Sequence, residues 1–378
     1  MVSRVSSLEL FADKDPSNPV LLCDLLDELL TEGRVDDALA RLRGAPTSLR
    51  ATAGVKFREA RCALMHQDFA VALGILRPLL LESPDAAPGI RHDLAYALLA
   101  LGLLDEALQT LAVVHTQGDD GIVIALLKAR ILHRQSQCDT ALEVLEPLSS
   151  GARMAEVYGL RALLLLDLGE TVRASTEATR ALAVDPEQFE AALVSGTVAL
   201  WARDIDSSTT TFQQVLASHP NSGRALLGLG QNLMLRGDIL TARVVLDRAS
   251  TEMADHIGTW HALAWCELLE GDLAGAKHSF DQAFAIDRTF GETHGGFALV
   301  YALRGERKEA EESIKRATRL DPDGQSARYA QSVLLLDEGR PDEARKIVEG
   351  ILVKPAGHAM NVSMDFIFKL RELVRPRG

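Results

Sequence analysis

The residues of this chain that could carry catalytic or metal chemistry are dispersed along the sequence. Its four cysteines form no CxxC pair, a pattern that fits a reducing compartment and excludes a cysteine-based zinc site; they are Cys23, Cys62, Cys138 and Cys266. The histidines are scattered, and the spacing of His256 and His261 does not place both on one helix face. No GxSxG, HExxH, P-loop or GxGxxG context is present. We therefore expect no enzymatic activity, no metal and no cofactor.

Composition restricts the classes of partner and the type of core. The net charge of −13 disfavours sequence-independent binding to DNA or RNA, so we expect no nucleic-acid partner and easier binding to a polypeptide. Apolar residues make up 47% of the chain but aromatic residues only 5%. Such a core consists mainly of alanine, leucine and valine, which favours closely packed helices over a sheet sandwich.

The sequence contains no pattern that predicts secretion or membrane insertion. The N-terminal residues lack an apolar targeting segment, and the longest apolar stretch runs only from Leu94 to Leu104 before it meets acidic residues. We therefore expect a cytoplasmic protein without membrane insertion.

The elements that must position any binding residues are set by an internal repeat. A small residue recurs every 33–35 residues, at Ala38, Ala72, Ala107, Ala141, Ala174, Ser208, Ala242, Ala276, Ala310 and Ala344. A fixed period in this range predicts a stack of identical supersecondary units. Such a stack offers an extended surface to partners.

One period reads as two helices joined by a turn. In the unit 291–324, apolar residues fall three and four apart from Phe297 to Ala302, Gly305 ends the first helix, and a second apolar stripe runs from Ala310 to Leu320. The Asp321-Pro322 step closes the unit. A glycine lies five residues before the small residue in seven units, at Gly33, Gly102, Gly169, Gly237, Gly271, Gly305 and Gly339.

With this unit, the chain resembles the tetratricopeptide repeat family over about residues 19–356. The first-helix small positions match at Ala60, Ala95, Ala129, Ala162, Gly196, Gly230, Ala264, Ala298 and Ser332, and the aromatic positions match at Phe212, Trp260, Phe280 and Tyr301. Leu26 and Ser208 depart from the pattern. The resemblance implies an all-α fold, a right-handed α-solenoid of about ten antiparallel helix pairs.

Two terminal segments lie outside the repeats. Residues 1–18 are expected to be an N-terminal extension with a short capping helix that contains Val5, Leu8 and Phe11. Residues 357–378 are expected to form a C-terminal capping helix with a basic tail. Its apolar stripe consists of Met360, Met364, Ile367, Leu370 and Val374.

In the resembled family, first helices line a concave groove that binds partners. The resemblance implies that this groove is lined in the N-terminal half by Phe57, Arg61, His92, Tyr96, Arg130 and His133, and in the C-terminal half by Arg224, Gln231, His261, Trp265 and Tyr329. Aromatic side chains beside arginines are typical of interaction hot spots. The competing interpretation is that individual rings pack inward, because a one-residue register error changes their direction.

Two further interpretations stay open at this point. Gly295-Gly296 inside a first helix either allows a close helix crossing or leaves space for a ligand. For the whole chain, we expect a scaffold or adaptor that binds a protein or peptide segment in the groove. The alternatives are a small-ligand or signalling-peptide receptor, or a structural protein that associates with itself.

Overall fold

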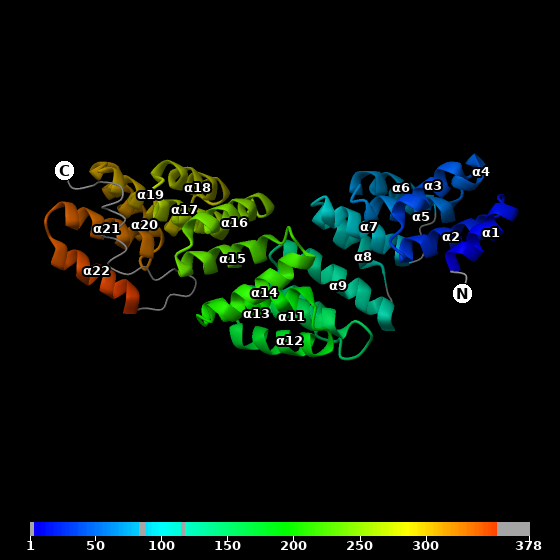
Figure 1. Cartoon of the computed structure of the whole chain (residues 1–378), viewed down its shortest axis with the longest axis horizontal. Helices are drawn as coiled ribbons and strands as arrows, with labels where there is room; N and C mark the ends of the chain where they lie inside the picture. Colours follow the sequence, from blue (N-terminus) through cyan, green and yellow to red (C-terminus); the bar gives the residue numbers. More distant parts are fainter. Residues whose placement is uncertain (1–3, 83–87, 115–117, 354–378) are drawn as a thin grey trace. The chain divides into compact units, whose positions relative to one another are not determined.

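The computed structural model describes residues 4–82, 88–114 and 118–353, which form helices and no strand (Figure 1). The chain divides into two compact units, unit 1 (Met1–Gln188) and unit 2 (Phe189–Gly378). The helices of unit 1 are α1 (Arg4–Lys14), α2 (Pro19–Thr31), α3 (Val35–Gly44), α4 (Thr47–Arg50), α5 (Ala53–Met65), α6 (Phe69–Glu82), α7 (Pro88–Ala100), α8 (Leu104–Ala112), α9 (Gly118–Arg134), α10 (Cys138–Leu145), α11 (Met154–Asp167) and α12 (Thr171–Val184).

Unit 2 continues the alternation of helices. It contains α13 (Phe189–Trp201), α14 (Ile205–Ser218), α15 (Gly223–Arg236), α16 (Ile239–Glu252), α17 (Ile257–Glu270), α18 (Leu273–Ile286), α19 (Gly291–Arg304), α20 (Arg307–Leu320), α21 (Gln325–Asp337) and α22 (Pro341–Val353).

Within each unit, the helices stack in pairs along the sequence. The first helices are α2, α5, α7, α9 and α11 in unit 1 and the odd-numbered helices α13 to α21 in unit 2. Each packs against the second helix that follows it, and that second helix packs against the next first helix of the same unit. The all-α stack of helix pairs predicted from the period is confirmed.

The small residue of each period lies where the two helices of a pair cross. All ten are fully buried, with 0% of their surface exposed: Ala38, Ala72, Ala107, Ala141, Ala174, Ser208, Ala242, Ala276, Ala310 and Ala344. A larger side chain at this position would push the helices apart. Ser208 satisfies its hydroxyl by donating to the Gly196 carbonyl at 2.8 Å and accepting from Asn232 Nδ2 at 2.8 Å.

The turn inside each pair has the left-handed backbone conformation in all ten repeats. The seven repeat glycines have φ between +72° and +82°. The same position in the other three repeats is occupied by Gln67, Ser136 and Arg203, with φ of +62°, +60° and +63°. The turn geometry therefore persists where the glycine is missing, at a steric cost to the residue that replaces it.

The N-terminal segment forms α1, which packs on the first pair. Val5 is buried in the cluster formed by the α2 leucines, whereas Phe11 is 52% exposed. Arg41 of α3 forms ion pairs with Glu9 at 3.3 Å and with Asp13 at 2.8 Å. The expected C-terminal capping helix at 357–378 lies outside the described residues.

Replacing Arg203 by glycine should stabilise unit 2, because glycine adopts φ of +63° without the Cβ clash. We expect the free energy of unfolding to rise by about 0.5–1 kcal/mol. All three tryptophans of the chain, Trp201, Trp260 and Trp265, belong to unit 2, so urea denaturation followed by their fluorescence reports on this unit. Arg203→Ala is the matched control. It removes the same side chain but keeps a Cβ, and an equal gain from alanine would contradict the backbone explanation.

Candidate binding surface on the first helices

Three of the predicted groove residues occupy one repeat position on successive first helices of unit 1. Arg61 of α5, Tyr96 of α7 and Arg130 of α9 each follow directly after the buried small residue of their helix. The Arg61 side chain is 44% exposed and Tyr96 is 43% exposed, while Arg130 is half-buried. Equivalent positions of successive repeats are neighbours in space, so these side chains form a row.

Acidic residues of neighbouring first helices lie beside this row. Arg58 holds Asp27 of α2 through two hydrogen bonds of 3.1 and 2.6 Å. Arg61 lies 3.6 Å from the Asp27 carboxylate and 3.8 Å from that of Asp93. The Asp93 carboxylate is also 3.0 Å from Nδ1 of His92. The two carboxylates thus have closer partners than Arg61, whose own contacts are long and loose.

The remaining unit 1 residues of the predicted groove are less accessible. Phe57 is half-buried against the core of α5, α6 and α7, with the Arg58 guanidinium 5.9 Å from its ring centroid. Nε2 of His133 lies 2.6 Å from the carboxylate of Asp167 on the next first helix, α11. Within the row itself, Tyr96 contacts Phe69 edge to face, with ring centroids 6.1 Å apart.

In unit 2, the predicted aromatic residues contact one another and leave little ring surface free. Trp265 of α17 contacts Tyr329 of α21 edge to face, with centroids 5.7 Å apart. Tyr329 is only 1% exposed, so its expected place on an accessible groove is wrong: the ring packs inward. Arg224 and Gln231 are half-buried on α15.

His261 is enclosed by aromatic rings. Its ring lies 5.3 Å from that of Phe280 and 5.4 Å from that of Phe290, and its Nε2 is 2.9 Å from Thr293 Oγ1 of α19. Burial lowers the pKa of His261 to about 4, because a charged imidazolium would lose its hydration there. At neutral pH His261 is therefore an uncharged, half-buried hydrogen-bonding group.

The paired glycines of α19 serve close packing. A Cβ on Gly295 would lie 2.7 Å from the Ala327 backbone nitrogen and 2.8 Å from Ser326 Cβ, and a Cβ on Gly296 would lie 2.4 Å from the Phe280 ring. The interpretation that these glycines leave space for a ligand is therefore wrong.

The Phe280–Gly296 contact recurs two repeats earlier, where a Cβ on Gly228 would lie 2.2 Å from the Phe212 ring. In the repeat that follows each of these two, an aliphatic residue faces an alanine instead: Leu246 with Ala262, and Ile314 with Ala330. In these repeats, a larger side chain on the second helix thus faces a smaller residue on the next first helix.

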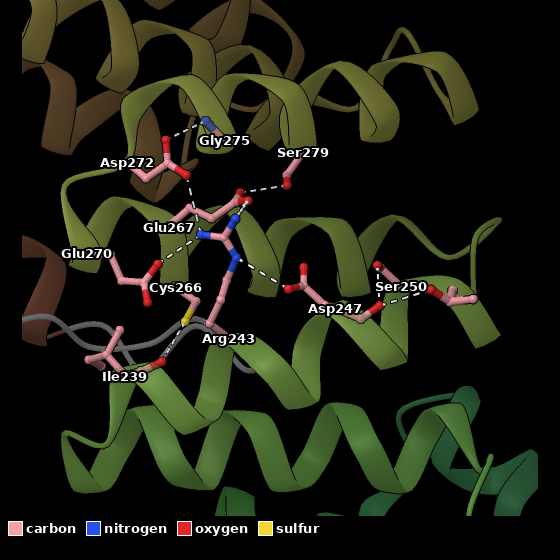
Figure 2. A network of polar contacts seen from close by, with 11 residues as sticks. Ile239, Arg243, Asp247, Ser250, Cys266, Glu267, Glu270, Asp272, Gly275 and Ser279 are labelled. Carbon is pink, nitrogen blue, oxygen red and sulfur yellow. Dashed lines mark hydrogen bonds and ion pairs between the residues drawn. The ribbon is translucent and has the colours of Figure 1, made fainter.

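A separate polar network in unit 2 surrounds Arg243 of α16 (Figure 2). Its guanidinium lies 3.0 Å from Glu267, 2.8 Å from Glu270 and 3.4 Å from Asp272, and Asp247 is 3.6 Å away. Ser279 of α18 donates to Glu267 at 2.6 Å. Burial raises the pKa of Glu267, opposed by the Ser279 hydrogen bond and the charge of Arg243. Arg243 Nε is buried without a hydrogen-bond partner, but the other groups pair with one another, so this network ties α16 to α17 and α18.

Two of the cysteines are poorly suited to nucleophilic chemistry. Burial raises the pKa of Cys62 to about 11 and of Cys266 to about 12, which keeps both thiols protonated and unreactive at neutral pH. Over residues 4–82, 88–114 and 118–353, no group of three or more histidine, cysteine or acidic side chains could hold a metal ion.

Sequence reasoning missed the acidic partners of the groove residues. Asp27 and Arg61 are 34 residues apart, as are His133 and Asp167. Equivalent positions of successive repeats are neighbours in space, so a separation near one period indicates contact. This signal was available in the sequence, and it would have paired these charges.

Comparison with known proteins agrees with the fold. A tetratricopeptide repeat model matches residues 63–131 and 267–334, and a second one matches residues 325–349. The chain therefore contains tetratricopeptide repeats in these segments. In the part of the chain that the structure describes, none of the helices has the length and apolar character that crossing a bilayer would require.

Individual relatives are distant. The Protein CTR9 homolog of Arabidopsis thaliana is 21% identical over 306 residues, which cover 68% of this chain and 28% of that protein. The chain thus spans little more than a quarter of the length of this curated relative. The Cut9–Hcn1 hetero-tetramer of APC/C is 13% identical, covering 92% of this chain and 81% of its own, with a TM-score of 0.45. The human IFIT1 dimer with m7Gppp-AAAA is 18% identical, covering 71% and 68%, with a TM-score of 0.44.

Replacing Gly295 by alanine should destabilise unit 2. The added Cβ meets backbone atoms of α21, which cannot move aside as a flexible side chain can, so we expect a loss of about 1–3 kcal/mol of unfolding free energy. Gly350→Ala is the control, because its Cβ would meet only the mobile end of Arg328. Differential scanning calorimetry of both variants tests this. Unchanged or higher stability for Gly295→Ala would restore the ligand-space interpretation.

The low pKa of His261 predicts a pH dependence of stability. The unfolded chain binds a proton at this histidine below about pH 6.5, whereas the folded chain binds it only near pH 4. Stability that is present above pH 6.5 is therefore lost as the pH falls toward 4. Between pH 7 and pH 4, the wild type should lose about 1–3 kcal/mol more than His261→Gln. Urea titrations read by tryptophan fluorescence check this, and parallel pH profiles for the two proteins would refute it.

Proposed function

We propose that this chain is a non-catalytic scaffold that holds a segment of a partner polypeptide against the first-helix face of unit 1. The observation that carries the proposal is the row of Arg61, Tyr96 and Arg130 on three successive first helices, with Arg61 and Tyr96 more than two-fifths exposed. Exposed tyrosine beside arginine is enriched in interaction hot spots.

The charges along this face support a partner with carboxylates. Asp27 is held by Arg58, and Asp93 lies closest to His92, so the loosely held Arg61 can turn to a new anion at little cost. A partner segment that offers an acidic residue to Arg61 and a flat or apolar residue to Tyr96 fits this row. Unit 2 offers less on its first helices, because Tyr329 is buried in its core and the half-buried His261 packs against Phe280 and Phe290.

The proposal predicts that the triple variant Arg61→Ala, Tyr96→Ala and Arg130→Ala loses most partner binding. Hot-spot truncations cost about 1–2 kcal/mol or more each, so we expect at least about a tenfold weaker affinity. The measurement is quantitative affinity capture from native lysate with wild type and variant, followed by titration of each captured protein.

The control replaces three exposed residues of second helices in unit 1 by alanine: Arg43 of α3, Val71 of α6 and Gln109 of α8. Both variants should melt like the wild type by circular dichroism, because the replaced positions are largely on the surface. If the row variant keeps every partner that the control keeps, the first-helix face of unit 1 is not the binding site.

A further inference from the structure

A hollow of about 450 Å³ lies on the second-helix side of unit 1, between α10 and α12 and above α11. Its apolar lining consists of the buried Leu165 of α11, the half-buried Leu142 of α10 and Val172 of α12, which is 82% exposed. Its volume falls in the range of small-ligand sites. The hollow is separate from the first-helix row, and its binding properties do not depend on the function proposed above.

Acidic side chains dominate the walls of this hollow. The lining contains two guanidinium groups, those of Arg161 and Arg173. It also contains five carboxylates: Asp139, Glu143, Glu146, Glu170 and Glu177. The formal net charge of the lining is therefore −3.

The two arginines are already used within the protein. Arg161 reaches from α11 to the end of α10, where its Nη2 donates to the carbonyls of Leu145, Glu146 and Leu148. Arg173 pairs with Glu170 at 2.6 Å. The positive charge of Arg161 thus offsets the negative end of the α10 dipole more than it offsets the wall carboxylates.

Several of the wall carboxylates keep free capacity for a cation. Within the described residues, the side chains of Asp139, Glu143 and Glu146 take part in no ion pair. Glu177 pairs with Arg180 through Oε1, but its buried Oε2 accepts no hydrogen bond there and lies 4.0 Å from Arg161. An acceptor without a donor at the wall of an open hollow favours a cationic ligand.

Unit 2 contains the same hollow with a different lining. A space of about 360 Å³ lies between α20 and α22 and above α21, and Leu335 stands there in the repeat position that Leu165 occupies in unit 1. The position of Glu146 is taken by Lys315, and that of Glu170 by Arg340. Its lining has three basic side chains and two carboxylates, so its formal net charge is +1.

The helix-pair geometry produces the hollow in both units. The charge is reversed at the positions of Glu146 and Glu170, but it is kept at that of Glu143, where unit 2 has Glu312. The net acidic lining of the unit 1 hollow therefore does not follow from the repeat architecture alone.

We propose that the hollow of unit 1 binds a basic side chain, arginine or lysine, of a partner polypeptide segment. The aliphatic stem of such a side chain lies along Val172 and Leu142, and its charged end reaches Glu143 and Glu146. Arginine suits the site best, because its planar fork can pair with two carboxylates. The chain thereby has a second polypeptide-binding surface on its second-helix side.

The test uses a fluorescein-labelled octapeptide with two arginines spaced by leucine and glycine, titrated with the full chain by fluorescence polarisation. Glu143 and Glu146 are exposed, so each ion pair to them contributes modestly, and we expect Glu143→Gln/Glu146→Gln to weaken binding by about fivefold or more. Glu312→Gln/Glu349→Gln removes the same charge from exposed second-helix positions in unit 2 and should change binding by less than about twofold.

Two further variants sharpen the test. Glu146→Lys/Glu170→Arg gives the hollow the residues of its unit 2 equivalent and should abolish binding, whereas the Arg61, Tyr96 and Arg130 triple variant should bind the peptide like the wild type. Hydrogen exchange should show peptide-dependent protection in 139–146 and 170–177. Equal weakening by the two glutamine pairs, or protection elsewhere only, would overturn the proposal. So would the absence of wild-type binding at millimolar peptide.

Discussion

The close crossing of the two helices in each pair is the constraint on which the rest of the structure depends. It requires a residue no larger than alanine or serine at one position of every repeat, and all ten such residues are fully buried. Where serine takes the place of alanine, its hydroxyl must be satisfied, and Asn232 of the next first helix supplies the donor. Because the crossing fixes how the helices of a pair approach, it also fixes which side chains of neighbouring repeats can meet.

A second constraint, the matching of side-chain size between repeats, explains why the first helices of the two units differ. In unit 2 the Phe280 ring fills the space left by Gly296, and Gly295 lets α19 approach α21 closely. In the same unit Trp265 contacts Tyr329 edge to face, and His261 packs against Phe280 and Phe290. In unit 1 the corresponding face is instead lined by charged residues, namely Asp27, Asp93 and the basic groups around them. One architecture thus gives an aromatic interior in one unit and a polar, more accessible face in the other.

The period, with its small residues and turn glycines, was sufficient to predict the helix pairs and their order. The turn at Gln67, Ser136 and Arg203 cannot be predicted from residue type, because these residue types are not typical of a positive φ. Only their position, five residues before the small residue, indicates it. The direction of Tyr329 was harder to predict. Its helix position was assigned to the groove by analogy with other repeats, and the close approach of α19 to α21, which depends on a glycine one repeat away, buried the ring. Local register decides which helix face a residue occupies, but the neighbouring repeat decides whether that face is open.

The same reasoning explains how a repeat protein can acquire different surfaces without changing its fold. Positions such as 146 and 315 share a backbone environment, so substitutions there cost little stability and are not restricted by the crossing of the helices. Glutamate at one and lysine at the other change the sign of the local charge while the space between the helices remains. The first-helix row at Arg61, Tyr96 and Arg130 follows the same rule, since each residue is adjacent to a buried alanine that sets its direction. Both proposed binding surfaces therefore use positions next to the fixed ones, where side chains can vary and the backbone cannot.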